Sequence, residues 1–443
     1  MLRCTQHDSY PPDHLSRAVA RSGIKRTNRE IYMDMKQSQI LTKGFSMNDT
    51  TLLSHLSLPE KALMFDLEAL YACLQTIPDR RDRRGLQYPF ASLLLIGLLA
   101  KLAGQDSCRG MAHWAKLRSR ELSQLFHLKR EKMPHYSTWS RVLGHGVEPS
   151  DVEHVLGQFF VIAAREAEPQ RGSIQLALDG KTLRGTIPLG ETRGVHLLAA
   201  YLPKQGVVLA QMRVDEKSNE ITHAPKLLTS LDLRGVVVSG DAMFDQRDLS
   251  MQLVQANGDY LWTVKGNQEG LREDIEVLFQ PHRERAGTSA PPNDFRTARS
   301  VEKGHGRLEK RIITVSSMLA EYSTWPELAQ VFKLESQRTD ALGVTKTELR
   351  YGLTSLPAQV AHPKRVLDLT RGHWGIENGL HYRRDATLRE DHAQVRMGHA
   401  PQMLAVLNNT VLGLFAKQGQ TNIAHARREF AYHFDKALAS LVA

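Results

Sequence analysis

The chain has 443 residues, a length that accommodates two or three domains and a large buried core. Its 58 Lys and Arg residues against 48 Asp and Glu residues give a formal net charge of +10 and an isoelectric point near 9.4, a diffuse basic bias that alone does not establish a polyanionic partner. The three cysteines, Cys4, Cys73 and Cys108, lie far apart, which argues against a disulfide framework or a cysteine zinc site and favours a reducing compartment.

The first 50 residues are polar and basic without a clear period, and we expect them to form a disordered extension. Met47 is an alternative start, which leaves open whether residues 1–46 belong to the native protein. No apolar stretch typical of a secretion signal is present there. The longest apolar run, residues 89–100, is shorter than the ~20 residues that a membrane span needs, so it predicts a buried helix and no membrane segment.

Residues 51–168 have helical periodicity and predict an all-α N-terminal domain. The helical segments are residues 60–75, 88–104, 107–126 and 152–167. The loop at residues 77–85 has four arginines in five residues, and a solvated loop is favoured over a phosphate contact. Residues 133–143, with the cap-like Ser137, are compatible with the second helix of a helix-turn-helix, although such helix pairs are also common in protein cores.

From residue 171 the pattern changes from helical to alternating, which is typical of β-strands. The predicted strands are residues 173–180, 195–202, 206–214, 234–242 and 259–268, and the predicted helices are residues 221–233 and 246–258. The first three strands have hairpin-like spacing and are expected to pair antiparallel. The order βββ-α-β-α-β, with Asp179 ending the first strand and Asp241 ending the fourth, predicts a ribonuclease-H-like α/β fold whose carboxylates converge at one edge.

Residues 280–356 alternate polar and apolar side chains and predict a β-rich insertion. This insertion divides the predicted catalytic domain into residues 169–279 and 357–416. Residues 417–443 predict a C-terminal helix.

The segment at residues 364–396 predicts one or two helices, with Pro363 as a start signal. At ~100° per residue, Glu377, His381 and Arg384 would share one face of an α-helix. A carboxylate, an imidazole and a guanidinium on one face are suited to work on a phosphate.

Asp179, Asp241 and Glu377 together suit metal-dependent phosphodiester chemistry. Two divalent ions can activate a nucleophile and stabilise the leaving oxygen. Carboxylates from separate segments are the hard ligands that Mg²⁺ prefers, and Mn²⁺ can take its place. The sequence therefore predicts a magnesium site formed by these three acids.

Each acid also has a structural alternative. The Asp179–Gly180 pair is typical of a turn, Asp241 could cap the next helix, and Glu377 could be an exposed helix charge. The strand order and the DGK and KGNQ segments favour catalysis. A zinc site is less favoured, because the histidines fit neither HExxH nor a cysteine-containing pattern. These histidines are His373, His381, His392 and His399.

Several motifs in one order extend from about Asp66 to Phe415. They are IPDRRDRRG, LALDGKTLRGT, VVVSGDAMFDQ, DYLWTVKGNQ, GHGRLEKR and RGHWGIENGLHYRRDATLREDHAQVR. In these motifs the chain resembles bacterial insertion-sequence transposases of the DDE class, in the ISAs-type branch that includes the H-repeat-associated proteins. The resemblance implies metal-dependent DNA cleavage and strand transfer, with Asp179, Asp241 and Glu377 as catalytic metal ligands.

The resemblance departs from the superfamily's Tyr-x2-Arg-x3-Glu-x6-Lys signature around Glu377. Thr370 and His373 stand where Tyr and Arg would be, and Arg384 stands where Lys would be. Arg384 keeps a cation that can hold a phosphate, although Arg and Lys are not equivalent.

The resemblance also implies contacts with double-stranded DNA, both element ends and target DNA. The expected DNA or phosphate contacts are Lys181, Lys265, Asn267, Gln268, His305, Arg307, His373, Trp374 and Arg384. Such contacts position the DNA backbone without reading its sequence. A homodimer on DNA, end binding by residues 51–168 and a bacterial cytoplasmic, nucleoid-associated location are further expectations. An inactive or domesticated DNA-binding protein and a ribonuclease-H-like nuclease are the alternatives.

Overall fold

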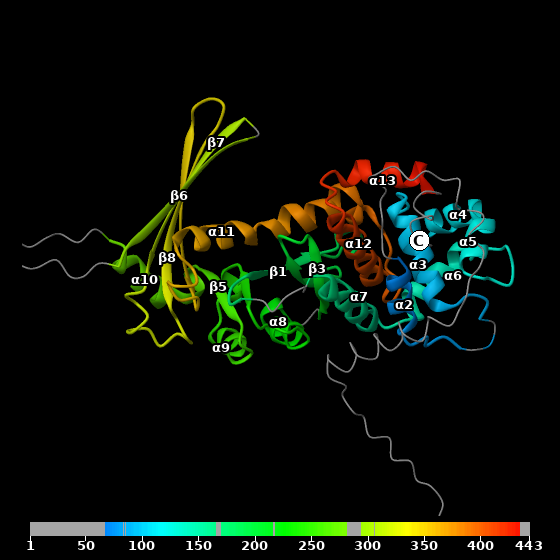
Figure 1. The fold of residues 1–443 in the computed structure, drawn as a ribbon, viewed down its shortest axis with the longest axis horizontal. Coiled ribbons are helices and arrows are strands. Elements are labelled where there is room, and N and C mark those ends of the chain that lie inside the picture. The colour runs from blue at the N-terminus through cyan, green and yellow to red at the C-terminus, as the bar shows by residue number, and fades with distance from the viewer. Residues whose placement is uncertain are drawn as a thin grey trace, which may run out of the picture. The chain divides into compact units, whose positions relative to one another are not determined.

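The computed structural model describes residues 67–82, 84, 86–164, 170–215, 218–280, 294–304 and 306–434, all of which belong to one compact unit (Figure 1). The extension predicted at residues 1–50 and the last part of the predicted C-terminal helix, residues 435–443, lie outside the described residues. Among the helices described, none combines the length and the apolar character that crossing a bilayer would require.

Helices form the first part of the described chain. They are α2 (Leu67–Gln75), α3 (Phe90–Leu102), α4 (Cys108–Leu117), α5 (Ser119–Leu125), α6 (Tyr136–His145) and α7 (Pro149–Ala164). The apolar run predicted as a buried helix is α3, which is buried on all sides. The single helix predicted at residues 107–126 is instead two, because Arg118 leaves the helical conformation at φ −118° and ψ 27°. The cap of α6 is His135, whose Nδ1 accepts from the Ser137 backbone N–H, so the predicted Ser137 cap is wrong.

A nine-stranded sheet follows and confirms the mixed α/β architecture. Its strands are β1 (Ile174–Thr182), β2 (His196–Leu202), β3 (Val207–Val214), β4 (Val236–Gly240), β5 (Asp259–Val264), β6 (Arg296–Gly304), β7 (Arg307–Ser316), β8 (Gln330–Thr339) and β9 (Thr345–Thr354). Their order across the sheet is β3-β2-β1-β4-β5-β9-β8-β7-β6. The first three strands are antiparallel, as predicted, and β4 and β5 join them parallel to β1. Because β9 pairs with β5, the later strands extend this same sheet.

Alternate side chains of the central strands pack into two different cores, one on each face of the sheet. Val238 packs in the core that includes α8 (Glu220–Thr229) and α9 (Arg247–Gln255). Its neighbour Val237 packs in the core that includes α11 (Pro363–His373). Figure 1 shows α8 and α9 on one side of the sheet and α11 on the other.

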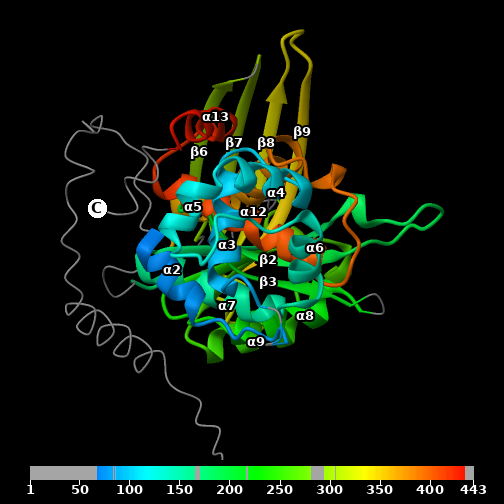
Figure 2. The ribbon, with the colours of Figure 1, turned by 90° about the vertical axis from the view of Figure 1, so that its right-hand side faces the viewer.

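Helix α12 (Ala400–Lys417) joins the N-terminal helices to the sheet. It contacts α3, α6, α7 and β3, and most of its side chains are buried (Figure 2). The last helix, α13 (Ile423–Tyr432), packs against α3 and α12. The two ends of the described chain therefore share a core beside β3.

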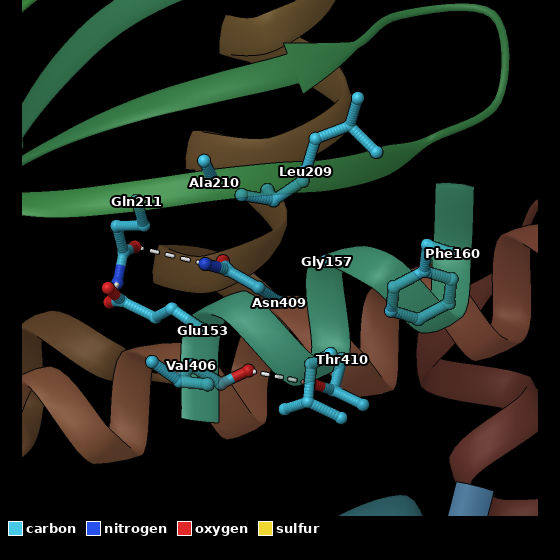
Figure 3. A pocket seen from close by; sticks show the side chains of 11 residues that line it. Glu153, Gly157, Phe160, Leu209, Ala210, Gln211, Val406, Asn409 and Thr410 are labelled. Carbon is cyan, nitrogen blue, oxygen red and sulfur yellow. Dashed lines mark hydrogen bonds between the residues drawn. The ribbon is translucent and has the colours of Figure 1, made fainter. Parts of the chain in front are cut away.

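Gly157 of α7 permits a close approach to β3. A Cβ here would collide with the backbone carbonyl oxygen of Leu209 (Figure 3). We expect Gly157→Ala to lower the free energy of unfolding by about 1–3 kcal/mol, because neighbouring backbone must shift. The control is Gly270→Ala in α10 (Glu269–Leu278), where no described residue beyond the adjoining part of the helix comes within 4 Å of the new Cβ and up to ~1 kcal/mol of stabilisation is expected. Chemical denaturation measures both, and a Gly157→Ala protein as stable as wild type would contradict this close packing.

Candidate active site

The first predicted acid, Asp179, lies within β1. It pairs with Ala199, and the strand continues through Thr182, so the alternative of an Asp-Gly turn is wrong. Side chains alternate along a strand, and Asp179 therefore faces the α11 side while Gly180 faces the α8 side. The carboxylate is held by a regular part of the sheet.

The second acid, Asp241, directly follows β4. Its Oδ1 accepts a hydrogen bond from the Met243 backbone N–H at 2.9 Å and caps the short helix η3 (Ala242–Phe244). Asp241 thus caps this short helix and not the helix predicted at residues 246–258, whose N-cap is Gln246, and its hydrogen bond fixes the carboxylate's orientation without excluding a second role. Because β4 runs parallel to β1 as its neighbour, Asp241 and Asp179 lie at the same end of the sheet.

The third acid, Glu377, begins a π-helical turn, Glu377–His381, and a second such turn, Arg383–Thr387, follows. In this geometry the Glu377 carbonyl accepts from the N–H five residues later, so each turn holds more residues than an α-helix. The predicted common face is therefore wrong in part. His381 stays beside Glu377, whereas Arg384 does not.

His381 lies between two of the acids. Its Nδ1 is 3.4 Å from Asp179 Oδ2 and 3.8 Å from Glu377 Oε2. One ligand atom from each of the three residues lies within 4.8 Å of the others, a spacing that could hold a metal ion. Asp241 is close enough for its charge to raise the pKa of Asp179. The structure thus brings two of the predicted acids, Asp179 and Glu377, together at His381, whereas Asp241 is not part of this group of ligand atoms.

The carboxylates of this site influence one another's protonation. Burial, followed by the charges of Glu377, Glu220 and Asp241, raises the pKa of Asp179 to about 7. The neighbouring His381 is the main cause of a lowered pKa at Glu377, to which Asp179 also contributes. Near neutral pH, a large fraction of the metal-free protein therefore carries a proton on Asp179, and a divalent cation must displace this proton to bind there.

Metal binding should consequently depend on pH. We expect the affinity for Mn²⁺ to rise about tenfold per pH unit below pH 7, and to level off above pH 8, as Asp179 loses its proton. Calorimetric titrations at pH 6, 7 and 8, in buffers of different ionisation enthalpy, measure both the affinity and the proton released. An affinity that is constant over this range would contradict the protonation of Asp179.

His373 and Trp374 end α11 beside the acids. Burial of the imidazole lowers the pKa of His373 to about 4, so the ring is neutral at pH 7 and cannot serve as a cation for phosphate. Its Nδ1 is buried and has no hydrogen-bond partner among the described residues. Trp374 is 50% exposed, and the Arg350 guanidinium lies over its ring at 5.1 Å. An exposed ring remains available to stack on a base.

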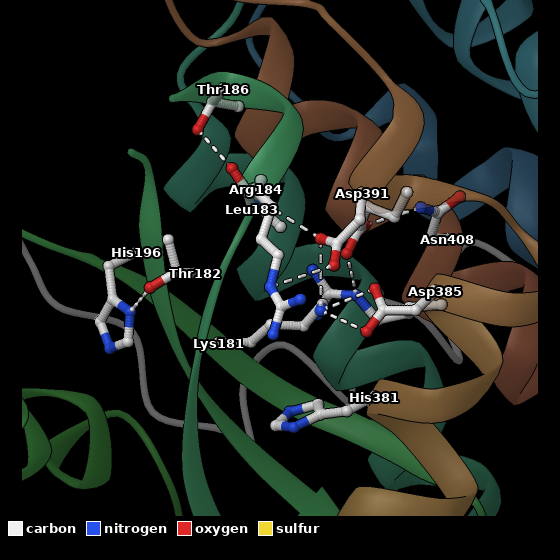
Figure 4. Close-up of polar contacts among 12 residues, drawn as sticks. Lys181, Thr182, Leu183, Arg184, Thr186, His196, His381, Asp385, Asp391 and Asn408 are labelled. Carbon is white, nitrogen blue, oxygen red and sulfur yellow. Dashed lines mark hydrogen bonds and ion pairs between the residues drawn. The ribbon is translucent and has the colours of Figure 1, made fainter. Parts of the chain in front are cut away.

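Lys181 is buried among acids on the α11 side of β1. Its Nζ is 2.7 Å from the Asp385 carboxylate and 3.6 Å from Asp391 Oδ1 (Figure 4). Arg184 approaches the same Asp391 carboxylate, with its Nε at 3.7 Å. The predicted phosphate contact at Lys181 is therefore not available in this conformation, and the lysine instead links β1 to the segment after the π-helical turns.

Arg384 is also placed differently from the prediction. It is 0% exposed, and its Nε donates to Glu390 Oε2 at 2.7 Å while Nη1 donates to Gln211 Oε1 at 3.2 Å. A guanidinium buried in this way cannot reach a phosphate, so the predicted phosphate contact is wrong for this structure. Arg384 is a core residue that connects the π-helical segment to β3.

The amides predicted to contact DNA brace the loop that holds Asp241. Asn267 Nδ2 donates to the Ala242 carbonyl at 2.6 Å, and Gln268 Nε2 donates to the Asp245 carbonyl at 2.9 Å. Both lie in η4 (Gly266–Gln268), directly after β5.

The remaining predicted contacts lie on the later strands or beside this loop. Lys265 is exposed next to η4. Arg307 begins β7, and its Nε lies 2.9 Å from Glu309 Oε1. His305 lies outside the described residues.

Sequence reasoning missed Glu220 and its partner His196, and it left His381 out of the catalytic set. His196 Nε2 lies 2.8 Å from Glu220 Oε1. His196 Nδ1 lies 2.8 Å from Thr182 Oγ1 on its other side, as Figure 4 shows. The four-residue step from Glu377 to His381 was a usable signal. No comparable sequence signal singles out Glu220, because an acid in the first turn of a helix is common.

Two family models match the chain. The model described as "DDE_Tnp_1-associated" matches residues 71–160, and the model described as "Transposase DDE domain" matches residues 170–414, more than half of the chain. Together with the approach of Asp179 and Glu377 to each other, the second match identifies the protein as an enzyme that cleaves DNA strands and transfers phosphoryl groups. The chain belongs to the DDE transposase family.

Curated relatives narrow the assignment. YhhI of Escherichia coli strain K12, an H repeat-associated protein named as a transposase, is 27% identical over 358 residues, which are 79% of this chain and 90% of YhhI. YbfD of the same strain, named in the same way, is 28% identical over 248 residues, 56% of this chain and 93% of YbfD. An uncharacterized protein of Xanthobacter autotrophicus is 34% identical over 285 residues, 63% of this chain and 92% of that protein. Within the family, the chain is therefore a transposase of the H-repeat-associated branch.

Proposed function

We propose that this transposase cleaves DNA at the ends of an insertion sequence and transfers the freed strand to target DNA, using Asp179, Asp241 and Glu377 to hold two Mg²⁺ ions. The observation that carries this proposal is the approach of Asp179 and Glu377, far apart in sequence, to the same atom, His381 Nδ1. Carboxylate oxygens suit Mg²⁺, and Mn²⁺ can substitute for it.

The protein's own groups have distinct roles in this proposal. Asp179 is fixed by strand pairing and Asp241 by its backbone hydrogen bond, so both carboxylates are preorganised. His381 Nδ1 lies within 4 Å of both Asp179 and Glu377, where it can orient the two carboxylates toward each other until the site is filled. When bound, the metal ions would activate the attacking water or hydroxyl and stabilise the leaving oxygen.

The proposal includes a ribonuclease-H-like catalytic domain at residues 169–279 and 357–416. The order β3-β2-β1-β4-β5, with β2 antiparallel and β4 parallel to β1, supports it. Residues 280–356 form the β-rich insertion. We further propose that the all-α domain at residues 51–168 binds element ends, that the protein acts as a homodimer on double-stranded DNA, and that it works in the bacterial cytoplasm at the nucleoid.

A strand-transfer assay tests this function. The full chain is incubated with Mg²⁺, a labelled fragment carrying the inverted repeats that flank its gene, and a target plasmid. We expect cleavage at the repeat followed by joining of the labelled 3′ hydroxyl to the plasmid. Cleavage without joining would replace the proposal with a nuclease, and end binding without cleavage would replace it with an inactive DNA-binding protein.

A further inference from the structure

Strands β6, β7, β8 and β9 form an arm that extends beyond the rest of the sheet. Val264, the last residue of β5, pairs with Tyr351 of β9, so residues 345–350 continue past the end of β5. Because β1, β4 and β5 are parallel, this is the edge of the sheet at which Asp179 and Asp241 lie. Figure 2 shows the distal parts of the four strands projecting past the helices. The arm thus begins at the edge that carries the candidate active site.

The two faces of the arm differ in how their charges are balanced. On the face toward α11, Glu302 of β6 pairs with Arg311 of β7 and with Arg371 of α11. The opposite face, on the side of α10, carries three exposed cations, Arg299, Lys303 and Lys310. None of these three side chains forms an ion pair among the residues that the structure describes. The arm therefore has one face with balanced charges and one cationic face.

The three cations form one cluster. Lys310 of β7 pairs with Val301 of β6, and Arg299 and Lys303 lie two positions to either side of Val301. Residues two positions apart along a strand share a face, and diagonal neighbours on adjacent strands are ~7 Å apart. Like charges at this separation repel each other. A cluster kept together without an acid indicates an anionic partner.

The surroundings of the cluster suit a DNA backbone better than a second copy of the protein. Val301 is 63% exposed, so no described part of the chain covers the cluster. Thr297 of β6 and Thr347 of β9 are exposed on the same face, and their hydroxyls can donate to phosphate oxygens. A two-fold dimer through this face would bring identical cations together. A polyanion would instead neutralise them.

We propose that this cationic face of the arm, around Arg299, Lys303 and Lys310, binds the phosphate backbone of the target DNA. The inference rests on the proposed function, in which target DNA accepts the transferred strand. Contacts with phosphates do not read base sequence, so the face accepts duplexes of any sequence. Because Asp179 faces the α11 side of the sheet, the element end can occupy the acids while the target is held on the α10 side of the arm.

Fluorescence anisotropy of the full chain with a labelled random-sequence duplex, which lacks the flanking repeats, tests this inference over a range of salt concentrations. Lys303→Gln/Lys310→Gln should weaken binding about tenfold. It should also make the slope of log K against log salt shallower by about 2, since each phosphate contact contributes ~0.9. Adding Arg299→Gln should remove about one unit more. The matched control is Arg338→Gln/Lys346→Gln, which removes two exposed cations from the opposite face of the arm and should bind like wild type.

The outcomes separate this inference from the proposed function. The inference is overturned if Lys303→Gln/Lys310→Gln binds the duplex like the control, or if it changes only the oligomeric state measured by light scattering. In either case, strand transfer by the wild-type protein would leave the proposed function in place. A wild-type protein that binds no DNA and joins no strands would refute the proposed function, and this inference with it.

Discussion

Asp179→Asn and Asp241→Asn should each slow strand cleavage at element ends by about a thousandfold or more, in Mg²⁺ or Mn²⁺. An amide has the shape of the carboxylate but not its charge, so it cannot balance a divalent cation. Binding to end-containing DNA should stay close to wild type, because phosphate contacts come from other parts of the surface. Quantitative cleavage and gel-shift assays on the same preparations measure the two effects separately.

Asp248→Asn is the matched control, because it removes an exposed acid in the first turn of α9. This variant should cleave normally. Full cleavage by both Asp179→Asn and Asp241→Asn would instead refute the assignment of the acids.

The stability of Asp179→Asn without metal shows whether a loss of cleavage comes from unfolding. A raised pKa in the folded protein means that stability is fully present below the unfolded value of 3.8 and is lost as pH rises through about 7. Replacing Asp179 should therefore stabilise the metal-free protein at pH 8, by up to ~4 kcal/mol. A variant that is more stable but inactive would identify a functional carboxylate.

The second large effect is expected at Arg384. Arg384→Met should lower the free energy of unfolding by about 3–5 kcal/mol, because it leaves the Glu390 carboxylate buried without its cation. The substitution also removes a donor from a hydrogen-bond network around Gln211. Gln211 accepts from both Arg384 and Asn409. It donates to Glu153 of α7, which lies beside it in Figure 3. Urea denaturation monitored by circular dichroism measures the change.

Arg383→Met is the matched control, because the Arg383 guanidinium contacts only the Thr421 carbonyl, at 3.5 Å, among the hydrogen bonds of the described residues. It should change stability by less than ~1 kcal/mol. In the double variant Arg384→Met/Glu390→Gln, part of the lost stability should return, because no unpaired charge remains. If Arg384→Met matched Arg383→Met, the buried ion pair would not be the origin of the effect.

The central strands could be predicted because their pattern is local. Ile174, Leu176 and Leu178 alternate with polar or small residues, and short turn segments separate the successive strands. The positions of Asp179 and Asp241 followed from these strands. The pairing of β9 with β5 could not be predicted, because nothing local specifies which edge a distant strand joins.

The neighbours of Glu377 could not be placed because the prediction assumed α-helical periodicity. The change to i→i+5 hydrogen bonds depends on packing against the rest of the protein and leaves no mark in the apolar pattern. The π-helical geometry directs Arg384 toward Glu390. The sequence alone does not show that a buried carboxylate lies where the Arg384 guanidinium ends. The same limit applies to Glu220, whose approach to Gly180 depends on the packing of α8 against the sheet.

Crystals of the full chain soaked in Mn²⁺ and measured at the manganese absorption edge would test the central claim most directly. Anomalous scattering should show two peaks about 4 Å apart, with carboxylate oxygens of Asp179, Asp241 and Glu377 within coordination distance. Mn²⁺ peaks that avoid these three side chains, in a protein that cleaves and joins DNA in the same buffer, would contradict it.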